Sequence, residues 1–168
     1  MPDKSTLKRA AADRRAGKSA STQAGEFVRQ EMHHIREGKH GAKNAKQAIA
    51  IGLSEARRAG VPLAAPEKGE AKERTRKGAQ RALRAGKRGS AKKKASPRRS
   101  RAIKRVLKRE PRSAASHRAL SRQAHSAAAR RTRSDRSAAA RKASRTKGAA
   151  IRSRAAKKAA RTRAAHRA

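Results

Sequence analysis

Large hydrophobic side chains recur with helical spacing mainly between residues 21 and 60. Val28, Met32 and Ile35 follow one another at intervals of four and three residues, and Phe27 stands beside them. This spacing places the side chains on one face of a helix, because an α-helix turns once in about 3.6 residues. The pattern therefore predicts an amphipathic helix whose apolar face lies in a core.

Residues that commonly begin and end helices stand at both ends of this stretch. Ser21 or Thr22 is suited to the N-cap, where a side-chain oxygen accepts a hydrogen bond from an early amide. Gly38 is suited to the position after the last turn, because glycine adopts a positive φ without strain. The stretch "EGKHGAKN" is expected to form the turn to a second helix.

A second helix is predicted from Ala42 or Lys43 to Ala59, with Gly60 after its last turn. Small or hydrophobic residues lie along one face of it, at Ala45, Ala48, Ile49, Gly52, Leu53 and Ala56. The small ones allow a neighbouring helix to approach closely, so we expect an antiparallel helical hairpin over residues 21–66. The predicted hairpin core consists of Phe27, Val28, Met32, Ile35, Ile49 and Leu53.

The rest of the chain has little hydrophobic periodicity. Residues 1–20 are a basic polar segment, with a short helix expected between Ser5 and Gly17. Residues 67–99 are expected to form a flexible basic linker. Residues 100–168 are rich in alanine and arginine, and we expect them to become helical when a polyanion removes the repulsion between their charges.

Composition favours disorder outside the hairpin. Val, Ile, Leu, Met and Phe total 17 of 168 residues, and the chain has no Trp or Tyr. Chains with so few large hydrophobic residues and a high net charge are usually disordered, because they bury too little surface to offset the entropy of ordering. The fold class predicted from the sequence is therefore all-α and largely disordered. The hairpin has nine large apolar side chains between Phe27 and Leu63, so a homodimer through it would add stability.

Charge is the strongest signal in the sequence. Fifty Lys and Arg residues stand against eleven acidic ones, a net charge of +39 with a pI near 12. Residues 1–73 carry a net charge of +6, whereas residues 74–168 carry 35 basic and two acidic residues, a net charge of +33. Such a segment repels itself and attracts polyanions. The polyanion that we expect is nucleic acid, with DNA favoured over RNA.

The basic residues are predicted to neutralise phosphates collectively, without one dominant contact. Reading of base edges needs side chains held rigidly in a groove, so no sequence preference is expected. The predicted contacts are Lys92, Lys93, Lys94, Arg98, Arg99, Arg101, Lys104, Arg105, Lys108, Arg109, Arg130, Arg131, Arg133, Arg141, Lys142, Arg145, Lys147, Arg152, Arg154, Lys157, Lys158, Arg161 and Arg163. A separate phosphate site at the turn and the start of the second helix is predicted to comprise Lys39, His40, Lys43 and Asn44.

Metal sites and catalysis are disfavoured. The chain has no cysteine, so disulfides and thiolate metal sites are excluded. Glu31 and His34 have the i, i+3 spacing of half a di-iron motif, but the sequence has no second copy of it. His33, His34 and His40 would form only an adventitious metal site. No set of nucleophile, base and orienting residue can be assembled, so we expect neither an enzyme nor a cofactor.

The sequence also bears on localisation. Its longest apolar run, "AIAIGL", is too short to span a membrane, and the first residues lack the apolar region of a signal peptide. Binding to a membrane surface is disfavoured, because no strong apolar face accompanies the charge. We therefore expect a cytoplasmic, nucleoid-associated protein.

Residues 21–61 resemble a family of small basic bacterial proteins of unknown function. The blocks that carry the resemblance are "STQAGEFVR", "IREGKHGA" and "KQAIAIGLSEARRAG", and the later "RALSRQAHSAAARR" and "RSAAARKASRTKGAA" resemble the basic tails of that family. The resemblance implies a bacterial cytosolic protein and brings neither an activity nor site residues. In composition the tail is also similar to the C-terminal tails of linker histones and to bacterial histone-like proteins, which implies compaction of DNA by charge.

Three functions remain open from the sequence. The first is histone-like DNA binding by the tail without sequence preference, with the hairpin organising that binding. The second is an RNA-binding or ribosome-associated protein, which composition does not separate from the first. The third is a hairpin that mediates dimerisation or another protein interaction, with the basic tail serving only to localise it.

Overall fold

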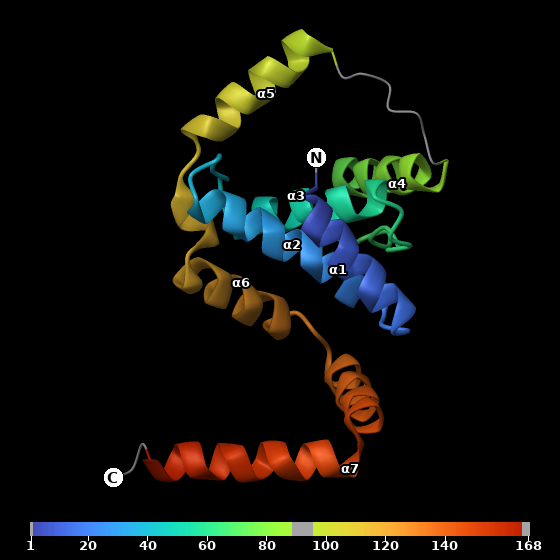
Figure 1. The fold of residues 1–168 in the computed structure, drawn as a ribbon, viewed down its shortest axis with the longest axis vertical. Helices are drawn as coiled ribbons and strands as arrows, with labels where there is room; N and C mark the ends of the chain where they lie inside the picture. Colours follow the sequence, from blue (N-terminus) through green and yellow to red (C-terminus); the bar gives the residue numbers. More distant parts are fainter. Residues whose placement is uncertain (1, 89–95, 166–168) are drawn as a thin grey trace. The chain divides into compact units, whose positions relative to one another are not determined.

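The computed structural model describes residues 2–88 and 96–165, apart from the side chains of Thr146 and Lys147. Seven α-helices and one short 3-10 helix follow one another along the described chain (Figure 1). They are α1 (Lys4–Arg15), α2 (Ala20–Arg36), α3 (Ala45–Arg58), α4 (Glu73–Lys87), α5 (Pro97–Arg109), η1 (Arg112–Ala115), α6 (His117–Ala129) and α7 (Arg133–Ala165). The chain divides into two compact units, residues 1–123 and residues 124–168.

The expectation of a largely disordered chain is wrong, because helices account for 77% of the described residues. The all-α part of that expectation is confirmed. Alanine favours helix more strongly than any other residue, and the stretches after residue 73 are rich in it, so helix forms there without a large hydrophobic core. A count of large apolar side chains misses this local preference. It also misses the alanines that are themselves buried.

α2 and α3 lie where the sequence predicts the two helices of a hairpin, and they pack against each other (Figure 1). Their backbones come close at Gly52, where a Cβ atom would lie 2.7 Å from the Cα atom of Val28. Ala45, Ala48 and Ala56, which share this side of α3, are buried. Small side chains therefore allow the two helices to approach closely, as the pattern predicts.

Side chains cap both hairpin helices at their N-termini. Ser19 caps α2, and its Oγ accepts a hydrogen bond from the Thr22 amide at 3.4 Å, so the helix begins earlier than the sequence predicts. Asn44 caps α3, and its Oδ1 accepts a hydrogen bond from the Gln47 amide at 2.9 Å. Gly38, with φ +79°, follows the last turn of α2 and ends it where the sequence predicts a stop.

Two hydrophobic clusters lie on the hairpin. The η1 cluster contains Met32 and Ile35 of α2 and Ala48 of α3, and it is closed by Ala114 and Ala115 of η1. Its closure therefore depends on residues some eighty positions further along the chain. Of the six predicted core residues, Phe27, Met32 and Ile35 are buried and Val28, Ile49 and Leu53 are half-buried.

The second cluster, which we call the α1 cluster, lies at the other end of the hairpin. It contains Phe27 of α2 and Ala56 of α3, and it is closed by Ala10 of α1 and Val61 of the segment after α3. Phe27 is 1% exposed. The single aromatic residue of the chain is thus buried by helices on both sides of it in the sequence.

α4 packs on α3 in a stretch for which the sequence predicts a flexible linker. Ala79 and Ala82 of α4 are buried, and a Cβ atom on Gly86 would overlap the carbonyl oxygen of Arg57. Arg57 is itself buried, and its guanidinium donates hydrogen bonds to two backbone carbonyls of the segment that leads to α4. α4 forms inside the predicted linker because alanine and glycine, which look featureless in the sequence, allow close helix packing here.

The loop between α2 and α3 holds the segment that follows α5. The Gly41 amide donates a hydrogen bond to the Leu107 carbonyl at 2.8 Å, and the Ala42 amide donates one to the Pro111 carbonyl at 3.2 Å. A Cβ atom at position 41 would overlap the carbonyl oxygen of Glu110, so the approach requires glycine. This loop therefore connects the hairpin to the junction between α5 and η1.

The second unit contains the end of α6 and all of α7, and none of its described side chains is buried. A capping box begins α7: the Asp135 amide donates to Thr132 Oγ1 at 3.1 Å, and the Thr132 amide donates to Asp135 Oδ2 at 3.1 Å. Gly148, with φ +59°, breaks α7 into two helical halves. No described helix has the length and the apolar composition of a membrane span.

Candidate nucleic-acid interface

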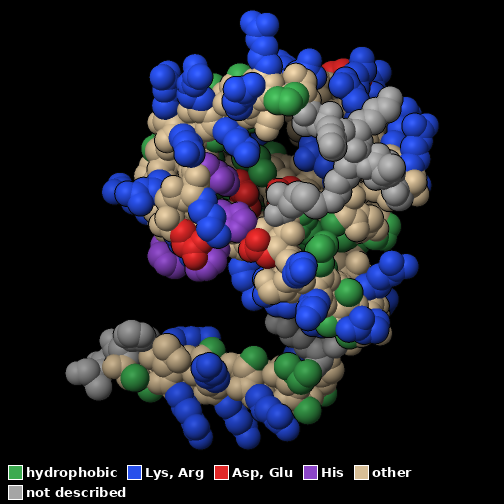
Figure 2. Space-filling view, turned by 45° about the horizontal axis from the view of Figure 1, so that its top comes forward, with side chains coloured by type: hydrophobic (Ala, Val, Ile, Leu, Met, Phe, Trp, Pro, Cys, Tyr) green, Lys and Arg blue, Asp and Glu red, His purple; other side chains and the backbone are tan. Residues whose placement is uncertain are grey.

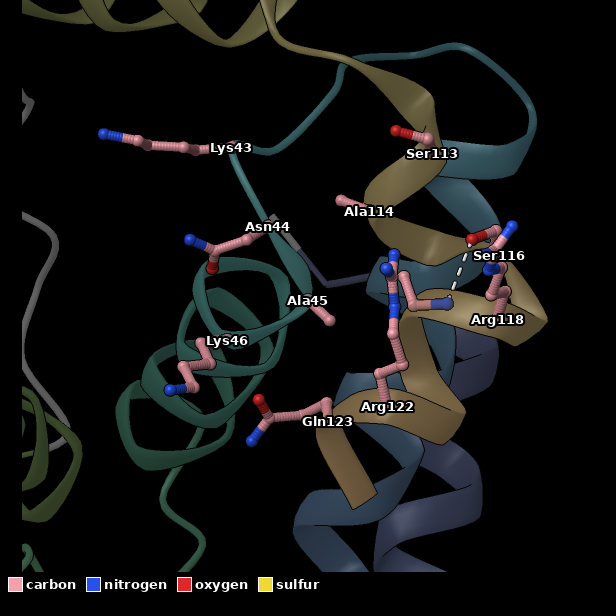
Figure 3. A pocket seen from close by; sticks show the side chains of 11 residues that line it. Lys43, Asn44, Ala45, Lys46, Ser113, Ala114, Ser116, Arg118, Arg122 and Gln123 are labelled. Atoms are coloured by element: carbon pink, nitrogen blue, oxygen red, sulfur yellow. Dashed lines mark hydrogen bonds between the residues drawn. The ribbon is translucent and has the colours of Figure 1, made fainter. Parts of the chain in front are cut away.

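An open groove of about 680 Å³ lies between the start of α3 and the start of α6 (Figure 3). Lys43, Asn44 and Lys46 line it on the α3 side. Arg118 and Arg122 line it on the α6 side. None of the described residues that line the groove is acidic. The groove therefore concentrates positive charge between two helix ends.

The start of α3 adds backbone amides to this charge. Asn44 accepts a hydrogen bond from the Gln47 amide at 2.9 Å, and the Gln47 side chain in turn accepts one from the Lys43 amide at 2.8 Å. The amides of Ala45 and Lys46 have no acceptor within the helix, because the first turn of a helix has no preceding helical carbonyls. Free amides and the positive end of the helix dipole favour an anion at this place.

A second helix N-terminus faces the same groove. Ser116 precedes α6, and its Oγ accepts a hydrogen bond from the Ala119 amide at 3.2 Å. Arg118 and Arg122 are one turn apart on α6, and both are exposed. Two helix N-termini and four cationic side chains thus converge on one groove. Such a combination suits the oxygens of a phosphate group.

The structure separates the four residues predicted to form a phosphate site at the turn. Lys43 and Asn44 line the groove, where the side-chain oxygen of Asn44 is engaged in capping α3. The Nζ atom of Lys39 donates a hydrogen bond to Oε2 of Glu37 at 3.0 Å. This hydrogen bond holds the pKa of the Glu37 carboxyl below its ordinary value. His40 does not line the groove, and its Nε2 atom lies 3.6 Å from Oε2 of the buried Glu31.

Sequence reasoning missed three of the four cationic residues that line the groove, namely Lys46, Arg118 and Arg122. The two arginines lie more than seventy positions after Lys43, and no local pattern relates them to it. Their i, i+4 spacing was the only available signal, and many basic pairs in this chain share it. The groove exists because η1 returns to the hairpin and brings the start of α6 with it.

α5 presents a dense set of basic side chains. Seven of its 13 residues are Lys or Arg, all seven are exposed, and the helix contains no acidic residue. Among the described residues no carboxylate forms an ion pair with any of them. Figure 2 shows Lys and Arg side chains over much of the visible surface, with Asp and Glu at only a few places on it. No described carboxylate therefore neutralises the charge of α5.

Carboxylates neutralise basic side chains mainly in the front part of the chain. Arg9 pairs with Glu26 at 2.7 Å, which ties α1 to α2. Arg76 pairs with Glu73 at 2.8 Å, and this hydrogen bond lowers the pKa of Glu73 from its ordinary value. Asp135 is the one acidic residue after Glu110, and it is engaged in capping α7.

The remaining predicted phosphate contacts lie on α5, on α7 and in the turn before α7. Those on α5 are Arg98, Arg99, Arg101, Lys104, Arg105, Lys108 and Arg109. Arg130 and Arg131 lie in the turn, and the rest lie on α7. All those with described side chains are exposed. Lys92, Lys93, Lys94 and the side chain of Lys147 lie outside the described residues.

Basic residues point in several directions from each half of α7. Neighbouring positions point about 100° apart on a helix, and both Arg141–Lys142 and Lys157–Lys158 are adjacent basic pairs. No single face of α7 is therefore reserved for a base-reading contact. This distribution suits a helix that meets phosphates from several directions.

In a comparison with known protein families, residues 14–68 match one family, which is described as a family of unknown function (DUF6496). The matched range comprises the end of α1, the α2–α3 hairpin and the segment before α4. It includes the α3 side of the groove and leaves out α5, α6 and α7. Comparisons with curated proteins and with solved structures find no match.

Proposed function

We propose that the chain binds nucleic acid, in the first place DNA, by neutralising backbone phosphates without reading base sequence. The groove between the starts of α3 and α6 carries this proposal, because four cationic side chains and two helix N-termini converge there. Such an arrangement favours phosphate groups. The backbone of a nucleic acid presents phosphates at regular intervals. The proposed activity is binding, without a catalytic step.

The exposed basic helices support the same proposal. α5 has 13 residues and is therefore about 20 Å long. Duplex DNA of that length carries roughly twelve phosphates. α5 has seven basic side chains that can neutralise them, and none of the seven has an ion-pair partner among the described residues. When a helix of this charge density binds a duplex, it releases counterions from the DNA, and this release favours the complex.

A nucleoid-associated, histone-like role is the finer form of this proposal. It is supported by the resemblance of the tail composition to histone-like proteins and by basic side chains spread around α7 rather than confined to one face. Contacts to phosphates position a protein on nucleic acid, whereas contacts to base edges specify sequence. We therefore expect equal affinity for unrelated sequences.

Fluorescence anisotropy with labelled duplexes of equal length and unrelated sequence tests the proposal. We expect affinities that agree among sequences and fall steeply with salt, with a log–log slope of about −0.9 for each phosphate contacted. A slope near zero, or no binding at low salt, would contradict the proposal. A matched single-stranded RNA and an RNA duplex in the same assay decide between DNA and RNA as the preferred polymer.

Matched pairs of substitutions test the groove itself. Lys43→Gln with Lys46→Gln removes two charges from the groove, and Lys4→Gln with Lys8→Gln removes two exposed charges from α1. We expect the groove pair to make the salt slope shallower by up to about 1.8 and the α1 pair to change it little. Equal losses from both pairs would show that only net charge matters and that the groove has no special part.

A further inference from the structure

Glu31 of α2 is a buried carboxylate in a chain that otherwise exposes most of its charges. Its side chain is 2% exposed, and its Oε1 has no hydrogen-bond partner among the described residues. Burial raises the pKa of the Glu31 carboxyl to about 7, against a smaller opposing effect of His40. Buried polar atoms in proteins nearly always have a partner, so an unsatisfied oxygen here calls for a ligand.

Two histidines face this carboxylate. His34 lies one turn further along α2, and His40 lies in the loop between α2 and α3. One ligand atom from each of Glu31, His34 and His40 lies within 4.8 Å of the other two. The Nε2 atom of His40 is 3.6 Å from Oε2 of Glu31, which is longer than a good hydrogen bond. The three groups therefore surround a point without closing on one another.

The hydrogen bonds around the histidines leave lone pairs for a ligand. The Nδ1 atom of His40 lies 3.1 Å from the carbonyl oxygen of Gly41. A carbonyl only accepts, so Nδ1 donates its hydrogen there, and in the neutral ring Nε2 then carries the lone pair on the side of Glu31. Histidines that bind metal ions commonly donate their second ring N–H to a backbone carbonyl or a carboxylate. The Nε2 atom of His34 lies 3.3 Å from Oδ2 of Asp3, which adds a second carboxylate beside the cluster.

We propose that Glu31, His34 and His40 form a binding site for a divalent transition-metal ion, with zinc as the best match. Two imidazole nitrogens and one carboxylate are a ligand set that zinc accepts, and three protein ligands leave a fourth position for water. Zinc ligands lie about 2.0–2.2 Å from the ion, so the three atoms need to move together by roughly 1 Å. Rotation of the side chains supplies such a movement.

The ligand types separate zinc from the commoner divalent ions. Magnesium and calcium prefer oxygen ligands, whereas imidazole nitrogen suits zinc, copper and nickel. The high positive charge of the chain opposes any cation, so binding depends on the local ligands and on screening by salt. At 0.15 M ionic strength the Debye length is about 8 Å, which limits the repulsion to nearby charges.

A metal ion at this site would stabilise the contact between the α2–α3 loop and the segment after α5. His40 precedes Gly41 and Ala42, whose amides hold the Leu107 and Pro111 carbonyls. An ion that joins His40 to Glu31 and His34 would fix this loop against α2. The proposed site thus stabilises the connection between the hairpin and the segment after α5, and it does not depend on nucleic-acid binding.

The test uses the full chain without an affinity tag, freed of metal with a chelator. Titration calorimetry with zinc chloride, at 0.15 M salt, is expected to show one ion per chain at this site, and magnesium chloride is expected to show none. Cobalt(II) in place of zinc is expected to give visible ligand-field absorption bands that are much more intense than the weak absorption of the octahedral hydrated cobalt ion. Zinc is also expected to raise the midpoint of thermal unfolding.

Variants decide whether these signals come from the proposed ligands. His40→Ala and His34→Ala are expected to lose more than about tenfold in zinc affinity, since even supporting residues of metal sites contribute tenfold or more. His33→Ala is the matched control, because His33 is the neighbour of His34, is 69% exposed and pairs with Glu37 instead. It should keep the affinity and the cobalt spectrum of the natural chain.

Two results would overturn the proposal. If His33→Ala loses as much affinity as His40→Ala, zinc binds adventitiously to exposed histidines. If Glu31→Gln keeps full affinity and the same cobalt spectrum, the buried carboxylate is not a ligand. Glu31→Gln keeps the shape of the side chain, so it decides the question even if a histidine variant fails to fold; circular dichroism checks the fold of each variant.

Discussion

At the level of single residues, Gly52 and Gly25 lie in opposite environments on the two helices of the hairpin. A Cβ atom on Gly52 would meet the backbone of α2, 2.7 Å from the Cα atom of Val28, whereas one on Gly25 would meet nothing within 4 Å. Alanine favours helix over glycine by about 0.5–1 kcal/mol at both positions. The steric cost therefore arises only at Gly52.

The alanine variants of these glycines should change stability in opposite directions. Gly52→Ala should lower the free energy of unfolding by roughly 1–3 kcal/mol, because α2 and α3 must separate to admit the methyl group. Gly25→Ala should raise the free energy of unfolding by about 0.5–1 kcal/mol. Urea unfolding followed by circular dichroism measures both changes. Stabilisation by Gly52→Ala would show that the two backbones do not meet there.

Asp135 gives the start of α7 a dependence on pH. Its hydrogen bonds with Thr132 lower the pKa of the Asp135 carboxyl from its ordinary value. A group whose pKa is lower in the folded state stabilises that state above the unfolded pKa, near 3.9 for Asp, and this contribution is lost as pH falls through the folded pKa. The capping box should therefore weaken in acid.

NMR titration of the full chain should show this weakening directly. As pH falls below about 3.9, the Cα chemical shifts of the residues after Arg133 should move toward random-coil values. In Asp135→Asn the same shifts should not change over this range, because Asp135 is the only acidic side chain after Glu110. An unchanged transition in the variant would assign it to another cause.

At the level of helices, α4 offers a comparison within one element. A Cβ atom on Gly86 would overlap the carbonyl oxygen of Arg57 in α3, whereas one on Gly78 would meet nothing within 4 Å. The two positions thus separate the packing of α4 on α3 from the helix preference of α4 itself. Both effects contribute to the stability of α4, because its buried side chains are alanines, which favour helix and also allow close packing on α3.

Gly86→Ala should loosen α4 from α3, and Gly78→Ala should not. We expect Gly86→Ala to speed hydrogen exchange at the amides of Ala79 and Ala82, which are buried on the helix that packs against α3. Gly78→Ala should slow exchange within α4, because alanine stabilises a helix by about 0.5–1 kcal/mol relative to glycine. Equal protection in the two variants would mean that α4 does not rest on α3.

At the level of the whole molecule, core and charge are divided between the two units. All the buried side chains of the described chain lie in residues 1–123. Residues 124–168 contain 15 basic residues and one acidic residue, a net charge of +14. A chain that ends at Gln123 therefore loses charge without losing core. A cut after Glu73, where the sequence becomes strongly basic, would also remove Ala114 and Ala115 from the η1 cluster.

Removal of residues 124–168 should weaken nucleic-acid binding and leave the first unit folded. The thermal unfolding midpoint of the shortened chain should match that of the full chain, since no described side chain of the second unit is buried. Its log–log slope of affinity against salt should become shallower by about 0.9 for each phosphate contact that is lost. An unchanged slope would show that the second unit does not touch the nucleic acid.

Much of this protein follows from local features of its amino-acid order. The positions of α2 and α3 follow from the spacing of Val28, Met32 and Ile35 and from the glycine after α2, because these features act within a few residues of one another. The excess of cations in the second half is a matter of composition and requires no structure. Alanine's helix preference is also local, and it explains why the basic stretches are helical even though few of their side chains are buried.

Contacts between distant residues account for the rest. Lys43 and Arg118 share a groove because Ala114 and Ala115 of η1 pack on the hairpin, and a short alanine pair carries no sign in the sequence of where it will pack. Glu31 and His40 come together because the loop after α2 turns back on that helix. Folding brings these groups together because burying small apolar surfaces and pairing backbone amides act between residues that the one-dimensional pattern leaves unrelated.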